Sequence, residues 1–147
     1  MGQYEKTGHD LTEGSKYCFA YLVIDVVGSS KLSNVLGLGK TDHILLHFQQ
    51  IVDNIATMFG GHLRSVSGDT CFIEFLLAND AAIQRVIDCA REILHATSSI
   101  ARTEQLQSDF QVRVGVHMGR TVFQSSESCL QSLGKHGISF ADARLSK

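Results

Sequence analysis

The order of the predicted elements indicates an α+β fold, in which an antiparallel β-sheet carries helices on one of its faces. An apolar run at residues 17–24 is typical of a buried strand, two later segments carry apolar residues at helical spacing, and a Gly-Asp turn joins two extended runs between them. The chain has 147 residues, enough for one core and too few for two ordinary domains. We therefore expect a flexible lead-in at residues 1–16 and a single domain at residues 17–147.

The first predicted strand is followed by a turn and a long helix. Residues 17–24 are rich in aromatic and branched side chains, which predicts a central strand that is buried on both faces and ends near Asp25. Gly28 and the two serines after it turn the chain, and Thr41 or Asp42 is expected to cap a helix that ends at the glycine pair 60–61. The apolar stripe of this helix comprises Ile44, Leu45, Phe48, Ile51, Val52, Ile55 and Phe59.

A hairpin and a second helix come next. Residues 62–67 and 70–75 are predicted strands, and the two residues between them, Gly68 and Asp69, form a tight turn. The second helix starts near Asn79 or Asp80 and ends in a polar stretch. Its apolar side comprises Ile83, Val86, Ile87, Ala90, Ile93 and Leu94.

The last third of the chain predicts a further strand and a helical tail. Residues 110–116 alternate apolar and polar side chains, and a shorter extended run follows at residues 121–123. We expect residues 130–147 to form a turn and a short helix. The resulting order of elements is that of the ferredoxin-like split β-α-β sandwich. In that arrangement the first strand lies beside the hairpin, so Asp25 and Asp69 approach each other.

Composition excludes several classes of function. The formal net charge is −2 and 44% of the residues are hydrophobic, so the surface lacks the excess of basic residues that binds nucleic acid. The longest apolar run is far shorter than the roughly 20 residues that span a bilayer, so we expect no membrane insertion. The first sixteen residues carry acidic side chains and no apolar stretch, which is unlike a secretory signal and favours a cytoplasmic location.

Asp25 and Asp69 form the candidate chemical centre. Two carboxylates at neighbouring strand ends suit Mg²⁺, which takes one or two aspartates and leaves its other positions to water and phosphate oxygens. The turn after Asp25 offers amides and small hydroxyls that can hold phosphate oxygens. We expect the phosphate-binding residues to be Val26, Val27, Gly28, Ser29 and Ser30. The structural alternatives are a plain strand-to-helix turn capped by one of the serines and an ordinary hairpin aspartate.

Four segments in order resemble the signatures of class III nucleotidyl cyclases, the adenylyl and guanylyl cyclase homology domain. Residues 22–32 contain Asp25 and look like the first signature, and residues 60–69 run from a Gly-Gly pair to a Gly-Asp turn as in the second. Residues 112–119 are similar to the third, and residues 143–145 look like the end of the fourth. The similarity extends over nearly the whole chain.

The resemblance implies a homodimer with composite sites at its interface, which converts a nucleoside triphosphate into a 3′,5′-cyclic nucleotide and pyrophosphate. Asp25 and Asp69 match the family positions that bind two Mg²⁺ or Mn²⁺ ions. Arg144 matches the catalytic arginine that the partner chain supplies to stabilise developing negative charge.

The chain departs from the family at the positions that contact the nucleoside. Phe140 occupies the ribose-contact position, where the family has an asparagine, and it cannot hydrogen-bond to a ribose. Ser65 occupies the base-selecting position, and strand alternation would place Arg64 on the opposite face. A second base-contacting position falls near Leu133, Gly137 is one residue away from the family glycine, and the chain ends soon after the fourth segment.

Two hypotheses follow. In the first, the domain is a cyclase with unusual base choice, whose activity is weak or lost because ribose- and base-contacting positions are changed. In the second, it is a non-catalytic nucleotide-binding or regulatory dimerisation module in signal transduction. A polymerase-like reaction on a related fold would need its own signature in the hairpin, which residues 65–70 do not provide.

Overall fold

The computed structural model describes residues 14–122 of the chain. The chain divides into two compact units, of which one is Cys18–Gly119 and the other contains both chain ends. Of that second unit only residues 14–17 and 120–122 are described. The site and the core discussed below lie entirely within Cys18–Gly119.

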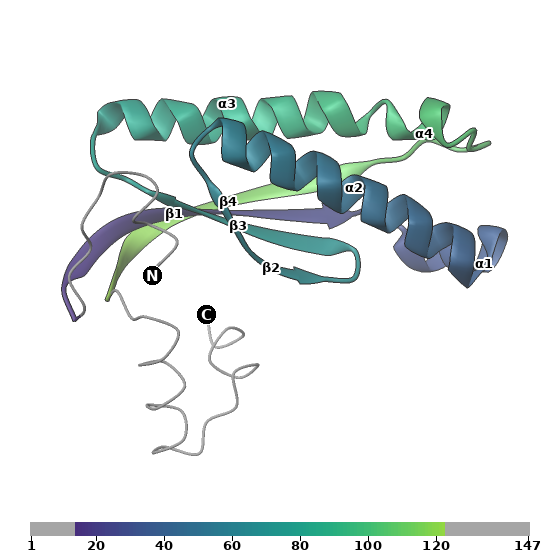
Figure 1. Ribbon diagram of the computed structural model, residues 1–147, viewed down its shortest axis with the longest axis horizontal. Coiled ribbons are helices and arrows are strands. Elements are labelled where there is room, and N and C mark those ends of the chain that lie inside the picture. The colour runs from purple at the N-terminus through teal and green to yellow at the C-terminus, as the bar shows by residue number, and fades with distance from the viewer. Residues whose placement is uncertain (1–13, 123–147) are drawn as a thin grey trace, which may run out of the picture. The chain divides into compact units, whose positions relative to one another are not determined.

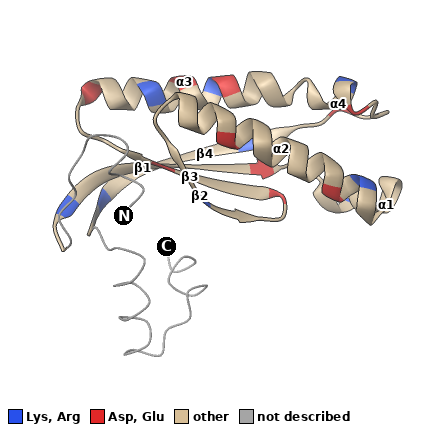
Figure 2. Cartoon of the chain, viewed as in Figure 1, with Lys and Arg blue, Asp and Glu red and all other residues tan. Residues whose placement is uncertain are grey.

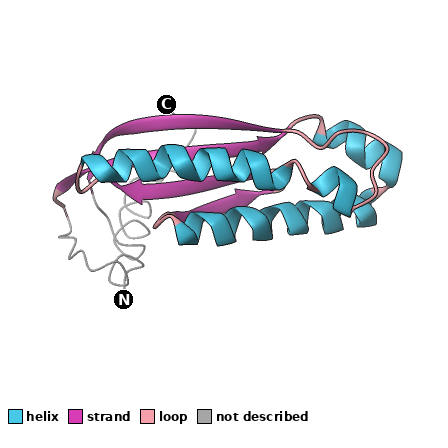
Figure 3. Ribbon diagram, turned by 90° about the horizontal axis from the view of Figure 1, so that it is seen from above, coloured by secondary structure: helices cyan, strands magenta, loops and turns pink. Residues whose placement is uncertain are grey.

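The described elements form a four-stranded antiparallel sheet with helices on one face (Figure 1). The strands are β1 (Lys16–Val26), β2 (His62–Ser67), β3 (Thr70–Leu76) and β4 (Val112–Val122), in the spatial order β2-β3-β1-β4. The helices are α1 (Ser29–Leu36), α2 (Leu38–Met58), α3 (Asp80–Thr97) and α4 (Ile100–Thr103), and the view from above shows α2 and α3 lying along the sheet (Figure 3). The predicted split β-α-β arrangement is confirmed.

The core lies between the sheet and the two long helices. Alternate residues of β1 face the helices and are buried, whereas Tyr21, Val23 and Asp25 face the other side and are only partly covered. The prediction that β1 is buried on both faces is therefore wrong. The core residues that join the sheet to the helices include Ala20, Leu22, Ile24, Ile44, Phe48, Val52, Ile73, Val86, Cys89 and Ile93.

Two helices, rather than a turn and one helix, connect β1 to the hairpin. Gly28 adopts a left-handed φ of 70° and is the N-cap of α1, so neither serine after it caps a helix through its side chain. Gly37 separates α1 from α2, which begins at Leu38. The predicted cap at Thr41 or Asp42 is wrong, because Thr41 is buried inside α2 and its hydroxyl donates to the Gly37 carbonyl at 2.8 Å.

The glycine pair after α2 has two separate roles. Gly60, with φ at 79°, donates its amide to the Thr57 carbonyl, and the amide of Gly61 donates to the Ala56 carbonyl at 2.8 Å. This is the Schellman pattern, which satisfies carbonyls at the helix end. A Cβ at Gly61 would lie 2.6 Å from Phe75 Cζ. Only glycine therefore fits at this position, where the backbone before β2 lies directly against the core.

The segment from α3 to β4 agrees only in part with the prediction from the sequence. The predicted helix start near Asn79 or Asp80 is confirmed, and Asn79 is the N-cap of α3, because its Oδ1 accepts the Ala82 amide at 3.1 Å. The polar stretch after α3 contains α4, which was not predicted. The two extended runs predicted on either side of Gly119 are one continuous strand through Val122, whereas Phe123 and the predicted tail lie outside the described residues.

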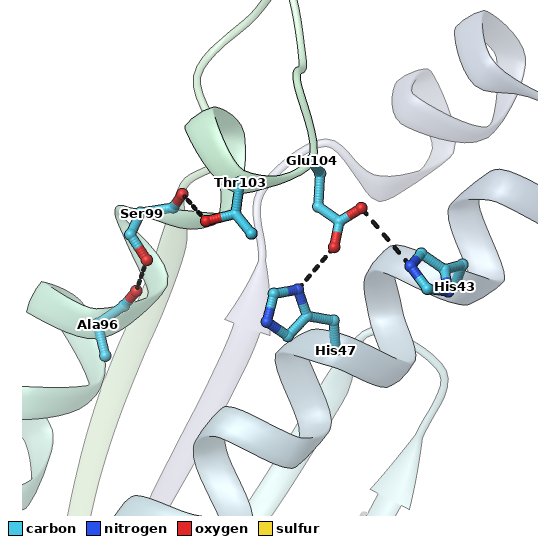
Figure 4. A network of polar contacts seen from close by, with 6 residues as sticks. All are labelled: His43, His47, Ala96, Ser99, Thr103 and Glu104. Atoms are coloured by element: carbon cyan, nitrogen blue, oxygen red, sulfur yellow. Dashed lines mark hydrogen bonds and ion pairs between the residues drawn. The ribbon is translucent and has the colours of Figure 1, made fainter.

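A polar network fastens the segment after α4 to helix α2 (Figure 4). Glu104 accepts from His47 Nδ1 at 2.7 Å and lies 3.6 Å from His43 Nε2, one turn earlier on the same helix. The Thr103 hydroxyl donates to the Ser99 carbonyl at 3.1 Å. These contacts fix the start of the loop that leads into β4 and so help to place that strand beside β1.

Candidate functional site

Asp25 and Asp69 lie at the same end of the sheet. In the β1–β3 ladder Asp25 is opposite Thr70, the first residue of β3, and Asp69 occupies the hairpin turn immediately before it. The Val26 amide donates to the Asp69 carbonyl at 3.0 Å, which ties the turn to the end of β1. Figure 2 shows acidic segments in red where β1 ends and where the hairpin turns.

The hydroxyl of Thr70 lies between the two carboxyl groups. Its Oγ1 is 3.1 Å from Asp25 Oδ1 and 3.4 Å from Asp69 Oδ1. A hydroxyl has a single proton to donate, so the two carboxylates share one donor. The structure thus brings together the two acidic side chains that the sequence singles out, although they lie far apart in the chain.

The other carboxylate oxygens also have protein donors. Ser29, in the first turn of α1, donates from its hydroxyl to Asp69 Oδ2. Arg113 donates from Nη2 to Asp25 Oδ2, and its side chain is 73% exposed against 28% for Asp25. Three side chains of this chain, Thr70, Ser29 and Arg113, therefore serve as donors to the four carboxylate oxygens.

Sequence reasoning missed Arg113 as a member of the site. A usable signal was present, because Val112 and Val114 alternate with Arg113 and pack against the core. The side chain of Arg113 must then project from the opposite face of the sheet, which is the face that carries Asp25. What the sequence did not supply was the neighbour relation between β4 and β1.

Two of the predicted phosphate-binding residues have their amides engaged in the sheet. Val26 donates to Asp69, and Val27 donates to the Gln111 carbonyl at 2.9 Å. The remaining predicted residues, 28–30, form the N-cap and first turn of α1, where amides have no partner further back in the helix. This helix start, rather than the strand end, is the part of the loop that can meet an anion.

The base-selecting position lies next to a β-bulge. Leu63 and Ser65 pair with consecutive residues of β3, so Arg64 is an extra residue in β2. Ser65 is opposite Phe72, which shares the open face with Glu74, and Arg64 Nε lies 3.0 Å from Glu74 Oε2. The expectation that Arg64 faces away from Ser65 is therefore wrong, because the bulge breaks the simple alternation.

The residues around this bulge form a partly buried polar cluster. Glu74 pairs with Tyr21 on one side and His62 on the other. Burial raises the pKa of Tyr21 to about 12, with a further rise from the Glu74 charge. Burial also lowers the pKa of His62, with a further lowering from the Arg64 charge. At neutral pH the phenol of Tyr21 is protonated, and it lies beside the ion pair of Arg64 and Glu74.

A cavity of about 630 Å³ lies beside the loop after β1. It is bounded by α1, the start of α2 and residues 105–110, and Lys31 and Lys40 contribute positive charge to its wall. Neither Asp25 nor Asp69 lines it. The cavity is therefore adjacent to the carboxylate pair and distinct from it.

The carboxylate pair fits a divalent cation by the chemistry of its donors. The side chains supply hard oxygen atoms, and a cation, the Arg113 guanidinium, already contacts one of them. Within residues 14–122, no group of three or more His, Cys, Asp or Glu side chains could hold a metal ion. Two aspartates alone match Mg²⁺ or Mn²⁺, whose other positions are filled by water and phosphate oxygens.

Several predicted positions lie outside the described residues. They are Arg144, Phe140, Leu133 and Gly137. In the part of the chain that the structure covers, no helix is both long enough and apolar enough to cross a membrane.

Comparison with known proteins identifies the fold. No family model and no curated protein matches the chain. Among solved structures, the guanylyl cyclase Cya2 superposes with a TM-score of 0.68 at 17% identity, covering 79% of this chain and 62% of that one. A bacterial light-regulated adenylyl cyclase gives 0.64 at 16% identity, with 77% and 60% covered.

A third structure, the guanylate cyclase domain of RhGC from Catenaria anguillulae in complex with GTP, gives a TM-score of 0.60 at 16% identity, with 76% of this chain and 64% of that one covered. This chain thus spans roughly three fifths of the length of these proteins. Together with the observed strand order, these similarities show that the chain has a class III nucleotidyl cyclase-like fold.

Proposed function

We propose that this chain is a nucleotidyl cyclase-like domain that binds a nucleoside triphosphate together with two Mg²⁺ or Mn²⁺ ions at Asp25 and Asp69. The observation that carries the proposal is the convergence of these carboxylates on the hydroxyl of Thr70, at the end of β1 and in the turn before β3. In the active form, two copies pair and convert the triphosphate to a 3′,5′-cyclic nucleotide and pyrophosphate.

The described residues have separate tasks in this proposal. Asp25 and Asp69 provide the charged oxygens, and the ladder between β1 and β3 holds them in register. The first-turn amides of α1, at Ser29 and Ser30, lie at the positive end of the helix dipole, which attracts a phosphate. Bound divalent ions would lower the pKa of the attacking ribose hydroxyl and neutralise charge on the triphosphate.

The proposed activity is weak, and its base preference differs from that of typical family members. Phe140 offers no hydrogen bond to the ribose, so the attacking hydroxyl is positioned less well. Ser65 stands where the family has a base-selecting lysine or glutamate, and it is paired with Phe72 in the sheet. Arg144, supplied by the second copy, would stabilise negative charge that develops at the phosphates.

A second candidate function is nucleotide binding without turnover, which would make the chain a regulatory dimerisation module. It is favoured by the substitutions at Phe140 and Ser65, since both remove contacts to the nucleoside and leave the carboxylate pair intact. The two candidates share the metal site and differ in whether product forms.

The test incubates the protein with each of the four common nucleoside triphosphates and Mn²⁺ or Mg²⁺, and measures cyclic nucleotide. The proposal predicts slow product formation that Asp25→Asn, Asp69→Asn and Arg144→Ala each reduce severely. Asp42→Asn, which changes an exposed aspartate on α2, is the matched control and should leave the rate unchanged.

If no product forms but nucleotide binding depends on the metal and on Asp25, the regulatory candidate is supported instead. If the protein binds no nucleotide in the presence of Mn²⁺ and none in the presence of Mg²⁺, both candidates are wrong.

A further inference from the structure

Arg113 is a cation within the proposed metal site. Its guanidinium donates to Asp25 Oδ2, while Thr70 lies 3.1 Å from Asp25 Oδ1. Both oxygens of this carboxylate are thus occupied by donors from the chain itself. A divalent cation that uses Asp25 meets a positive charge already in contact with its ligand.

The two cations cannot both have full use of Asp25. A guanidinium and a metal ion carry like charges, and each gains its stabilisation from the same carboxylate. Arg113 is the partner that can move, because 73% of its side chain is exposed and it belongs to β4, at the end of the strand order. Its neighbours Val112 and Val114 pack on the core face, so β4 stays in place when the Arg113 side chain moves away from Asp25.

We propose that Arg113 is the resident counter-cation of Asp25 and that divalent metal binds this site by exchange with it. The inference rests on the proposed metal site and adds a regulatory property to it. Arg113 stabilises the metal-free carboxylate and weakens the apparent affinity for metal. The site therefore responds to metal at a higher concentration than the carboxylate pair alone would.

The expected size of the effect follows from the exposure of the pair. Ion pairs with an exposed partner contribute about 0.2–1 kcal/mol, which corresponds to a change in the dissociation constant of about 1.4- to 5-fold. Replacing Arg113 by glutamine should therefore tighten metal binding by about this factor. Arg113→Lys keeps the charge but lacks the planar fork of donors, and should give an intermediate affinity.

The test measures Mn²⁺ binding by electron paramagnetic resonance for wild type, Arg113→Gln, Arg113→Lys and a charge-matched control. The control is Arg91→Gln, an exposed arginine on α3, which lies on the helix side of the sheet. We expect tighter Mn²⁺ binding in Arg113→Gln and an unchanged affinity in Arg91→Gln.

Thermal unfolding separates exchange from a purely structural role. Arg113→Gln should lower the unfolding temperature of the metal-free protein by a few degrees, and this loss should disappear at saturating Mn²⁺, where the pair is already broken in wild type. A structural role predicts the same loss with and without Mn²⁺.

Each outcome decides the matter. Unchanged or weaker Mn²⁺ binding in Arg113→Gln, or an equal loss of stability in both conditions, overturns the exchange inference. If wild-type binding still depends on Asp25 and Asp69 in that case, the proposed metal site survives. If neither wild type nor Arg113→Gln binds Mn²⁺, the metal site and the exchange both fail.

Discussion

Replacing Gly61 by alanine tests how the start of β2 is placed against the core. A Cβ at this position would lie 2.6 Å from Phe75 Cζ, 2.8 Å from Ile73 Cγ2 and 2.9 Å from Phe75 Cε1. Ile73 and Phe75 are buried in the core, so neither can move aside freely. The strand start must therefore shift, or the two side chains must leave their preferred conformations.

Overpacking of this kind costs about 1–3 kcal/mol, which lowers the unfolding temperature of a chain of this size by roughly 3–12 °C. Thermal unfolding followed by far-ultraviolet circular dichroism measures the change. The control is Gly39→Ala, in the first turn of α2, where an added Cβ meets nothing within 4 Å. That variant should gain roughly 0.4–1 kcal/mol. An unfolding temperature for Gly61→Ala within about 1 °C of wild type would refute the close approach.

Two further predictions concern helix α3 and the buried thiols. Asn79→Ala removes the side-chain cap on the Ala82 amide and should lower the free energy of unfolding by about 1 kcal/mol in urea titrations. Asn79→Asp keeps an oxygen that can accept from this amide, so its free energy of unfolding should stay close to that of wild type. In the native protein, iodoacetamide at pH 8 should modify the exposed Cys18 far faster than Cys71 and Cys89, because burial raises the pKa of each of these two thiols to about 12. Equal rates for the three thiols would contradict the burial of the latter two.

The sequence predicted the elements whose pattern is local and strong. The hairpin turn at Gly68 and Asp69, the long apolar stripe of α2 and the start of α3 near Asn79 are all set by residues close in the chain, and all were found in the structure. The approach of Asp25 and Asp69 followed from the order of the elements alone.

What the sequence could not predict depends on contacts between distant residues. The bulge at Arg64 is visible only from the pairing of β2 with β3, and it changes which face the arginine occupies. The ion pair between Arg113 and Asp25 requires β4 to lie beside β1. The start of α2 was placed too late because Thr41 satisfies its hydroxyl within the helix, so its capping tendency is not used.

The central claim is that Asp25 and Asp69 act together in binding divalent cations. Its most direct test is Mn²⁺ binding by wild type, Asp25→Asn, Asp69→Asn and the double variant. We predict that each single substitution weakens binding at least about tenfold and that the double variant binds little worse than either, because ligands of a shared centre are not additive. Single variants that bind as wild type does, or losses that add fully in the double variant, would contradict a common centre.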